Sequence, residues 1–181
     1  MRAGILLADG VEEVEAITVI DVLRRAQIEV ITISIKDTKK IHGAHDVYIG
    51  ADAKFEDVQF GGMNMIILPG GGKGTENLKN DDRVIAKVKE FYETGKYVAA
   101  ICAAPTVLAK AGILDGKKAT CYPGCEAEFD AKVKHTGQRV VTDGKIITGL
   151  APGAAMEFAL KLVEELCGIG IQSQVKKEMC A

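Results

Sequence analysis

The sequence predicts an α/β protein with a mainly parallel sheet and helices on both of its faces. Short, continuous apolar runs rich in Ile and Val are bounded by Gly, Asp or Pro, which is typical of strands buried on both faces. Segments with helical spacing of apolar residues alternate with these runs, as in βαβ units. The 181 residues, 48% of them hydrophobic and only 5% aromatic, suit one domain with an aliphatic core. We therefore expect residues 1–181 to form a single domain.

The elements follow one another in a regular order. The strands are expected at Arg2–Ala8, Glu29–Ile35, Met65–Pro69 and Tyr97–Cys102. The helices are expected at Val11–Gln27, Asp81–Thr94, Ala103–Ala111 and Ala154–Leu166. In the first helix the apolar residues that share one broad face are Val14, Ile17, Val19, Ile20, Val22 and Leu23. Asp143-Gly144 is a two-residue turn pair, so Val140–Thr142 and Lys145–Gly149 are predicted to form a hairpin.

The composition excludes several classes of protein. A formal net charge of −2 without a basic stripe argues against binding to nucleic acid. No segment approaches the ~20 apolar residues of a membrane span, and Asp9 interrupts the apolar start too early for a signal peptide. The odd count of five cysteines indicates reduced thiols in a reducing compartment. A cytoplasmic protein is expected.

Cys102 is the main candidate for chemistry. It lies between a buried strand and a helix and is surrounded by small residues, as in a sharp strand-to-helix turn that exposes the side chain at its apex. Amide groups at the start of a helix at Ala103 would stabilise a thiolate, so its pKa is expected to lie well below that of a free thiol. A packed core thiol is the alternative for an arbitrary cysteine, but this position favours a nucleophile.

Two further loops follow buried strands, where sites of open α/β sheets form. Gly70, Gly71 and Gly72 match neither a Walker loop nor a dinucleotide fingerprint; we expect Gly71 and Ala103 to supply amide donors of an oxyanion hole. Glu15 lies toward the apolar face of the first helix, and as a partly desolvated carboxyl it is expected to hydrogen bond the sulfur or transfer protons. Glu12 and Glu13 are expected only to complement the helix dipole.

The remaining titratable residues give weaker signals. His42, His45 and His135 lie in polar segments and are expected on the surface. Cys121 and Cys125 have no histidine or second cysteine pair nearby in the sequence, so no metal site is predicted there. They are interpreted as packing thiols, with a facultative disulfide as the alternative.

Taken together, four segments resemble the ThiJ/PfpI superfamily, and within it the DJ-one deglycase branch. The matching segments are Ala8–Glu15, Ile67–Gly71, Ala99–Pro105 and Ala151–Phe158. The resemblance covers nearly the whole chain, and it implies a flavodoxin-like sandwich and a homodimer. It also implies a cofactor-independent enzyme acting on reactive dicarbonyls or on early glycation adducts, as a glyoxalase III-like enzyme or a deglycase. Cys102 would be the nucleophile, assisted by Glu15, and Gly70, Gly71, Ala103 and Tyr122 would line the substrate site.

The chain departs from the family pattern at two positions. Tyr122 stands where the family member has a histidine, and tyrosine cannot act as a base at neutral pH; we expect its ring to form part of the pocket wall. His45 replaces an arginine that neighbours the pocket across the family dimer. The second functional hypothesis is a protective protein, oxidation-sensing or chaperone-like, in which Cys102 is oxidised to sulfinic acid. A glutamine amidotransferase or a PfpI-type peptidase is disfavoured, because the glycine or histidine that each requires beside the cysteine is absent.

Overall fold

A central sheet of seven strands organises the chain. The computed structural model describes residues 1–181. In sheet order the strands are β10 (Val140–Asp143), β11 (Ile146–Gly149), β7 (Tyr97–Ile101), β6 (Met65–Leu68), β1 (Arg2–Leu7), β2 (Glu29–Ser34) and β5 (Ala53–Lys54). All neighbouring strands pair in parallel except β10 and β11, which form the predicted antiparallel hairpin.

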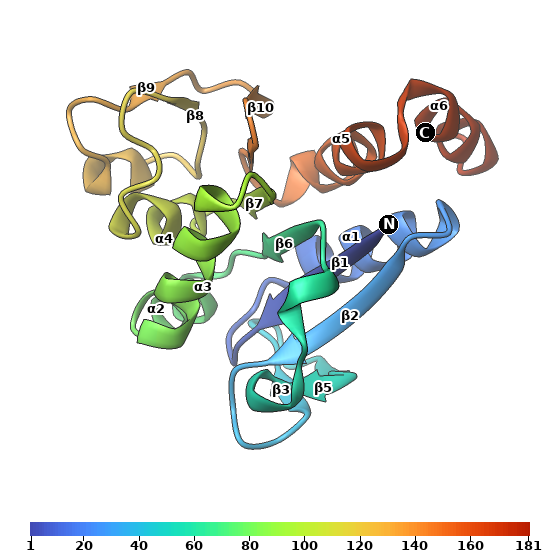
Figure 1. Cartoon of the computed structure of the whole chain (residues 1–181), viewed down its shortest axis with the longest axis horizontal. Helices are drawn as coiled ribbons and strands as arrows, with labels where there is room; N and C mark the ends of the chain where they lie inside the picture. Colours follow the sequence, from blue (N-terminus) through green and yellow to red (C-terminus); the bar gives the residue numbers. More distant parts are fainter.

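Helices cover both faces of this sheet (Figure 1). One face packs against α1 (Glu13–Arg25) and α5 (Ala155–Cys167), with α6 (Ile169–Glu178) beside α5. The other face packs against α2 (Gly72–Lys79), α3 (Asp82–Glu93) and α4 (Pro105–Lys110). Ile5 and Leu7 of β1 belong to the first core and Leu6 to the second, because successive side chains of a strand point to opposite faces. The predicted α/β sandwich is confirmed.

Short elements decorate the edges of the sandwich. β3 (Lys40–His42) and β4 (Tyr48–Gly50) form an antiparallel pair, whereas β8 (Lys118–Ala119) and β9 (Lys134–His135) form a parallel pair. Four single turns of 3₁₀ helix complete the chain: η1 (Phe55–Asp57), η2 (Phe60–Gly62), η3 (Cys125–Glu128) and η4 (Pro152–Ala154). None of the helices combines the length and the apolar character that crossing a bilayer requires.

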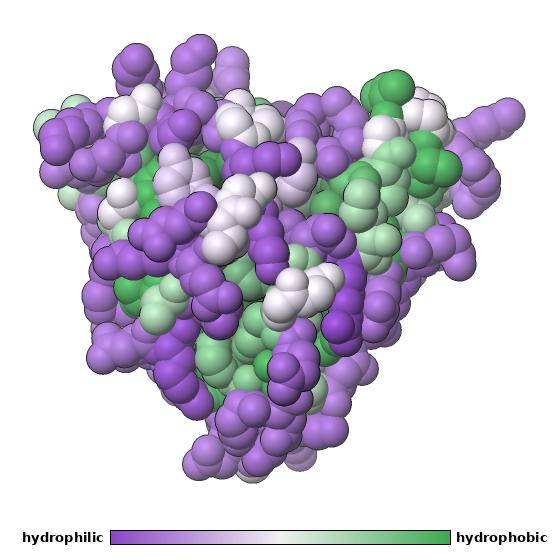
Figure 2. Space-filling model, in the orientation of Figure 1, coloured by the Kyte–Doolittle hydropathy of each residue, from purple (hydrophilic) through white to green (hydrophobic).

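Two of the residues predicted to be buried on α1 lie on the surface instead. Val14 is 53% exposed and Ile17 is 47% exposed, whereas Val19, Val22 and Leu23 are buried as expected. The buried stripe of α1 is narrower than the predicted one because only one side of the helix faces the sheet and α5. Exposed apolar residues also occur on α6, and Figure 2 shows hydrophobic residues gathered at the upper right, where α6 lies.

Candidate functional site

The predicted site residues meet beyond the carboxyl ends of three neighbouring strands. Cys102 directly follows β7, Gly70 and Gly71 follow β6, and Glu15 lies in the first turn of α1, which follows β1. Because β7, β6 and β1 are adjacent in the sheet, residues that are far apart in the sequence lie side by side. Such a position is the usual one for a site in an open α/β sheet.

Cys102 occupies a strained backbone conformation at this turn. Its φ of 64° lies in the left-handed region, which costs a non-glycine residue about 1–3 kcal/mol. Two hydrogen bonds hold it there: its N–H donates to the Gly149 carbonyl (2.9 Å), and its own carbonyl accepts from the Tyr122 N–H (2.8 Å). The side chain is nearly enclosed, since the residue is only 7% exposed. The helix that follows begins at Pro105 and not at Ala103 as predicted, because the tight turn comes first.

Glu15 is completely buried beside this cysteine. Its Oε2 accepts a hydrogen bond from the Gly70 N–H (2.7 Å), and the carboxyl is also hydrogen bonded to the Cys102 thiol. No other polar group of the protein reaches Oε1. Burial raises the pKa of Glu15 to about 7, against the lowering effects of its bonds with Gly70 and Cys102. Glu15 therefore exchanges its proton near neutral pH, as an effective acid or base must.

The thiol of Cys102 is harder to ionise than the sequence predicts. Burial is the largest cause. Together with the negative charge of Glu15 and the hydrogen bond to Glu15, burial raises the pKa of Cys102 to about 12. The N–H groups of Gly71 and Ala103 both hydrogen bond the sulfur and lower this pKa, but they do not outweigh burial. This direction is opposite to the lowered pKa that we expected from the sequence. Glu15 is the titratable side chain that lies against this sulfur.

The first two of the three glycines after β6, Gly70 and Gly71, are required by close packing. A Cβ on Gly70 would lie 2.6 Å from the Cys102 Cβ and 2.7 Å from Glu15 Oε2. Gly71 has a φ of 89°, and a Cβ there would collide with the Gly10 carbonyl. The N–H of Gly70 is already donated to Glu15, so Gly70 positions the carboxyl and offers no free donor to a substrate.

Tyr122 is attached to the site through its backbone. Its N–H bonds to the Cys102 carbonyl, which places the segment after β8 next to the nucleophile. The residue is 48% exposed, and the expected contribution of its ring to the pocket wall stays a prediction.

Glu13 has a structural role that the sequence did not reveal. Its carboxylate accepts hydrogen bonds from the backbone N–H of His45 (2.7 Å) and from His45 Nδ1 (2.9 Å). It is buried and fixes the loop between β3 and β4 to the start of α1, which is more than a contribution to the helix dipole. Glu12, Glu13 and His45 also bring three possible metal-ligand atoms close together, as do Cys121, Glu126 and His135 elsewhere.

Comparison with known proteins places this site in a family. The model of the DJ-1/PfpI family matches residues 1–165. The chain is 37% identical over 178 residues to the Parkinson disease protein 7 homolog of Danio rerio, covering 97% of this chain and 94% of that protein. It is 34% identical over 167 residues to a deglycase of Pyrococcus abyssi, covering 92% and 99% of the two chains.

The fold agrees with this assignment. The solved structure of oxidized DJ-1 from Toxoplasma gondii superposes with a TM-score of 0.94 at 34% identity, covering 99% of this chain and 97% of that one. The flavodoxin-like arrangement implied by the resemblance is thereby confirmed. With a family match that spans almost the whole chain and relatives that share both its length and its fold, this chain belongs to the DJ-1/PfpI family.

Proposed function

We propose that this protein is a cofactor-independent enzyme that converts small dicarbonyls such as methylglyoxal to hydroxy acids, with Cys102 as nucleophile and Glu15 as acid and base. The observation that carries this proposal is the buried contact between a thiol and a carboxyl whose pKa is about 7. A pair of this kind supplies a nucleophile and the group that activates it. The deglycase name of the Pyrococcus relative supports an enzymatic role on related chemistry.

The proposed reaction moves two protons through Glu15. The carboxylate takes the thiol proton as the sulfur attacks the aldehyde carbon, and it returns that proton to the aldehyde oxygen, which gives a hemithioacetal. Glu15 then removes the hydrogen of this carbon and delivers it to the neighbouring carbon, while the hydroxyl proton moves to the oxygen of that neighbouring carbon, which forms a thioester of lactate. Water hydrolyses the thioester, so the net reaction is methylglyoxal plus water to lactate and the thiol is restored. The Gly71 and Ala103 amides, which face the sulfur, are the available donors for the developing oxyanion.

Access to the site favours small free dicarbonyls over glycated protein side chains. Cys102 is 7% exposed and Glu15 is fully buried, so only a compact substrate reaches both without rearrangement. Deglycation of adducts is the second substrate class, and it would require the site to open.

The test measures lactate production from methylglyoxal by purified protein. Cys102→Ser should abolish it, whereas Cys180→Ser, which alters an exposed thiol, should leave it unchanged. A proton delivered by a fixed carboxyl gives one enantiomer of lactate, whereas reaction catalysed by buffer gives a racemic mixture. Racemic product, or equal rates for the wild type and Cys102→Ser, would contradict the proposal.

The rate should also depend on pH in a defined direction. Glu15 must be ionised to accept the thiol proton, so kcat/KM should fall as the pH drops below about 7 and level off above it. Glu15→Gln should lose roughly 10²-fold or more in turnover. A variant with unchanged turnover would reduce Glu15 to a residue that packs against Cys102.

Cysteine oxidation is the competing proposal. The Gly71 and Ala103 amides that hydrogen bond the sulfur are also placed to hold an oxygen of a sulfinate. The raised pKa of Cys102 affects both proposals, because the thiolate is the nucleophile as well as the species that oxidises readily. Mass spectrometry after mild peroxide treatment separates the proposals: selective gain of two oxygen atoms at Cys102, in a protein without turnover, would favour the oxidation-sensing role.

We further propose that two copies of the chain associate through the exposed apolar side of α1. Val14 and Ile17 on α1 are about half exposed, and so is Val47 in the loop that Glu13 ties to the start of this helix. Exposed apolar residues of this kind are common at protein interfaces. We also propose that the protein acts in the cytoplasm without a membrane partner, as expected from the sequence.

A further inference from the structure

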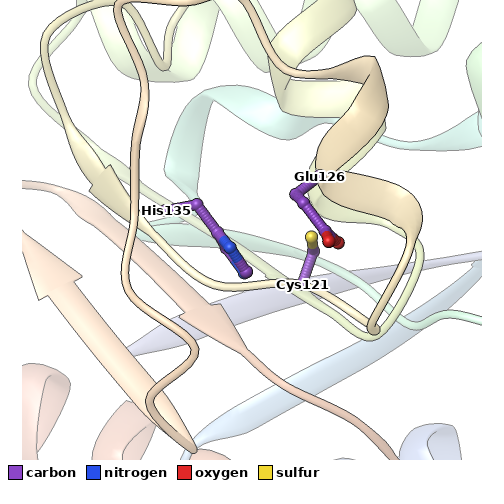
Figure 3. Close-up of side chains that lie close together, drawn as sticks. All are labelled: Cys121, Glu126 and His135. Atoms are coloured by element: carbon purple, nitrogen blue, oxygen red, sulfur yellow. The ribbon is translucent and has the colours of Figure 1, made fainter.

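Three side chains with metal-binding atoms meet beside the segment that contains Tyr122. Cys121, Glu126 and His135 each offer one ligand atom, and these atoms all lie within 4.8 Å of one another. Figure 3 shows the three side chains extending into a common space from separate segments. The sequence hides this cluster, because His135 is distant from Cys121 along the chain and was expected only as a surface residue.

The backbone determines this meeting. β8 and β9 pair in parallel with Ala119 opposite His135, and the Thr136 N–H donates to the Ala119 carbonyl (3.0 Å). Cys121 follows Ala119 by two residues, so the pairing brings the histidine alongside the thiol. The ring of His135 is packed edge-on against Phe129, with 6.1 Å between ring centroids, which limits its rotation.

Glu126 is held in place by its own turn. The Gly124 N–H donates to Glu126 Oε2 (2.6 Å), and the Cys125 N–H donates to the Tyr122 carbonyl (2.9 Å). A ligand carboxylate oriented by a second hydrogen bond is typical of metal sites in proteins.

We propose that Cys121, Glu126 and His135 bind one Zn²⁺ ion, with water in the fourth position. Thiolate, imidazole and carboxylate are the three ligand types that Zn²⁺ accepts in a tetrahedral site. A sulfur ligand disfavours Mg²⁺ and Ca²⁺, which require oxygen. The proposal does not depend on the reaction at Cys102, whose sulfur contacts Glu15, Gly71 and Ala103 instead.

Binding at this site is coupled to loss of a proton. Cys121 is completely buried beside the other two ligand atoms. Coordination of its thiol forms the Zn–S bond and breaks the S–H bond, and the proton passes to solvent.

The experiment uses Co²⁺ as a coloured probe of the zinc site on the full chain. Bound Co²⁺ should give the near-ultraviolet absorption of a thiolate ligand, at one ion per chain, and Zn²⁺ should displace it. His135→Gln and Glu126→Gln should each weaken binding by at least about tenfold, since even changes to groups behind the ligands cost 10- to 100-fold. His42→Gln, a change at a partly exposed histidine outside the cluster, should leave the affinity unchanged.

The variants also distinguish this site from the alternatives. Loss of the thiolate absorption in Cys102→Ser, with full binding in His135→Gln, would place the ion at Cys102 and overturn the proposal. Weakening by His45→Gln alone would place it at the Glu12–Glu13–His45 group. Because Cys121 is completely buried, Cys121→Ser is not used, and the variants at Glu126 and His135 carry the test. Unchanged Co²⁺ affinity in both Glu126→Gln and His135→Gln would refute the site.

Discussion

The buried carboxyl of Glu15 should make the stability of the protein depend on pH in an unusual direction. Folding raises its pKa from 4.5 to about 7, so the folded state binds this proton more tightly than the unfolded state does. The resulting stabilisation is fully present below the unfolded pKa and is lost as the pH rises through the folded pKa. A shift of about 2.5 units at 1.36 kcal/mol per unit amounts to about 3 kcal/mol. Glu15→Gln removes this titration.

The measurement is urea unfolding of the wild type and of Glu15→Gln at a series of pH values from about 4 to about 8. The difference between the two unfolding free energies should shift by about 3 kcal/mol in favour of the variant as the pH rises. Glu93→Gln, at an exposed position on α3, is the matched control and should give a constant difference. A constant difference for Glu15→Gln as well, or one that shifts in favour of the wild type, would refute the assignment of a buried, high-pKa carboxyl.

Three further substitutions test the site and its surroundings. Gly70→Ala places a methyl 2.6 Å from the Cys102 Cβ and should destabilise the protein by about 1–3 kcal/mol in thermal unfolding, while Gly170→Ala, in open space, should not. Tyr122→Phe should cost at most a neutral hydrogen bond, about 0.5–1.5 kcal/mol or roughly 2- to 13-fold in initial rate; a loss as large as that of Cys102→Ser would give the phenol a chemical role. Ile17→Asp should convert a dimer to a monomer in light scattering, and a wild type that is already monomeric would exclude the proposed interface.

The sequence predicted the central strands well because their signal is local. β1, β2, β6 and β7 are continuous runs of branched apolar residues, and each observed strand ends one residue before the predicted end. α2 and α6 were missed for a physical reason. α2 contains Gly72 and Gly74 and has few apolar residues, and α6 buries only Val175, so neither has a helical apolar stripe. These helices form where neighbouring elements of the fold support them.

The candidate site shows the same division between local and distant effects. The positions of Cys102, Gly71 and Glu15 followed from strand ends, which a sequence reveals. The pKa of Cys102 did not, because it depends on how deeply the turn is buried and on a carboxyl contributed by another element. The cluster at His135 depends on the pairing of β8 with β9, two strands of two residues each, which are too short to leave a pattern.

The order of the strands has a consequence for folding. The thiol, the amide donors and the carboxyl come from three parallel strands whose pairing is entirely long-range, and such pairing forms late and slowly. Until β6 is seated between β1 and β7, Cys102 has neither Glu15 nor Gly71 beside it and behaves as an ordinary accessible thiol. The rate at which Cys102 is alkylated during refolding therefore reports when β6 pairs with β1 and β7. Newly made chains pass through a period in which this cysteine reacts without selectivity.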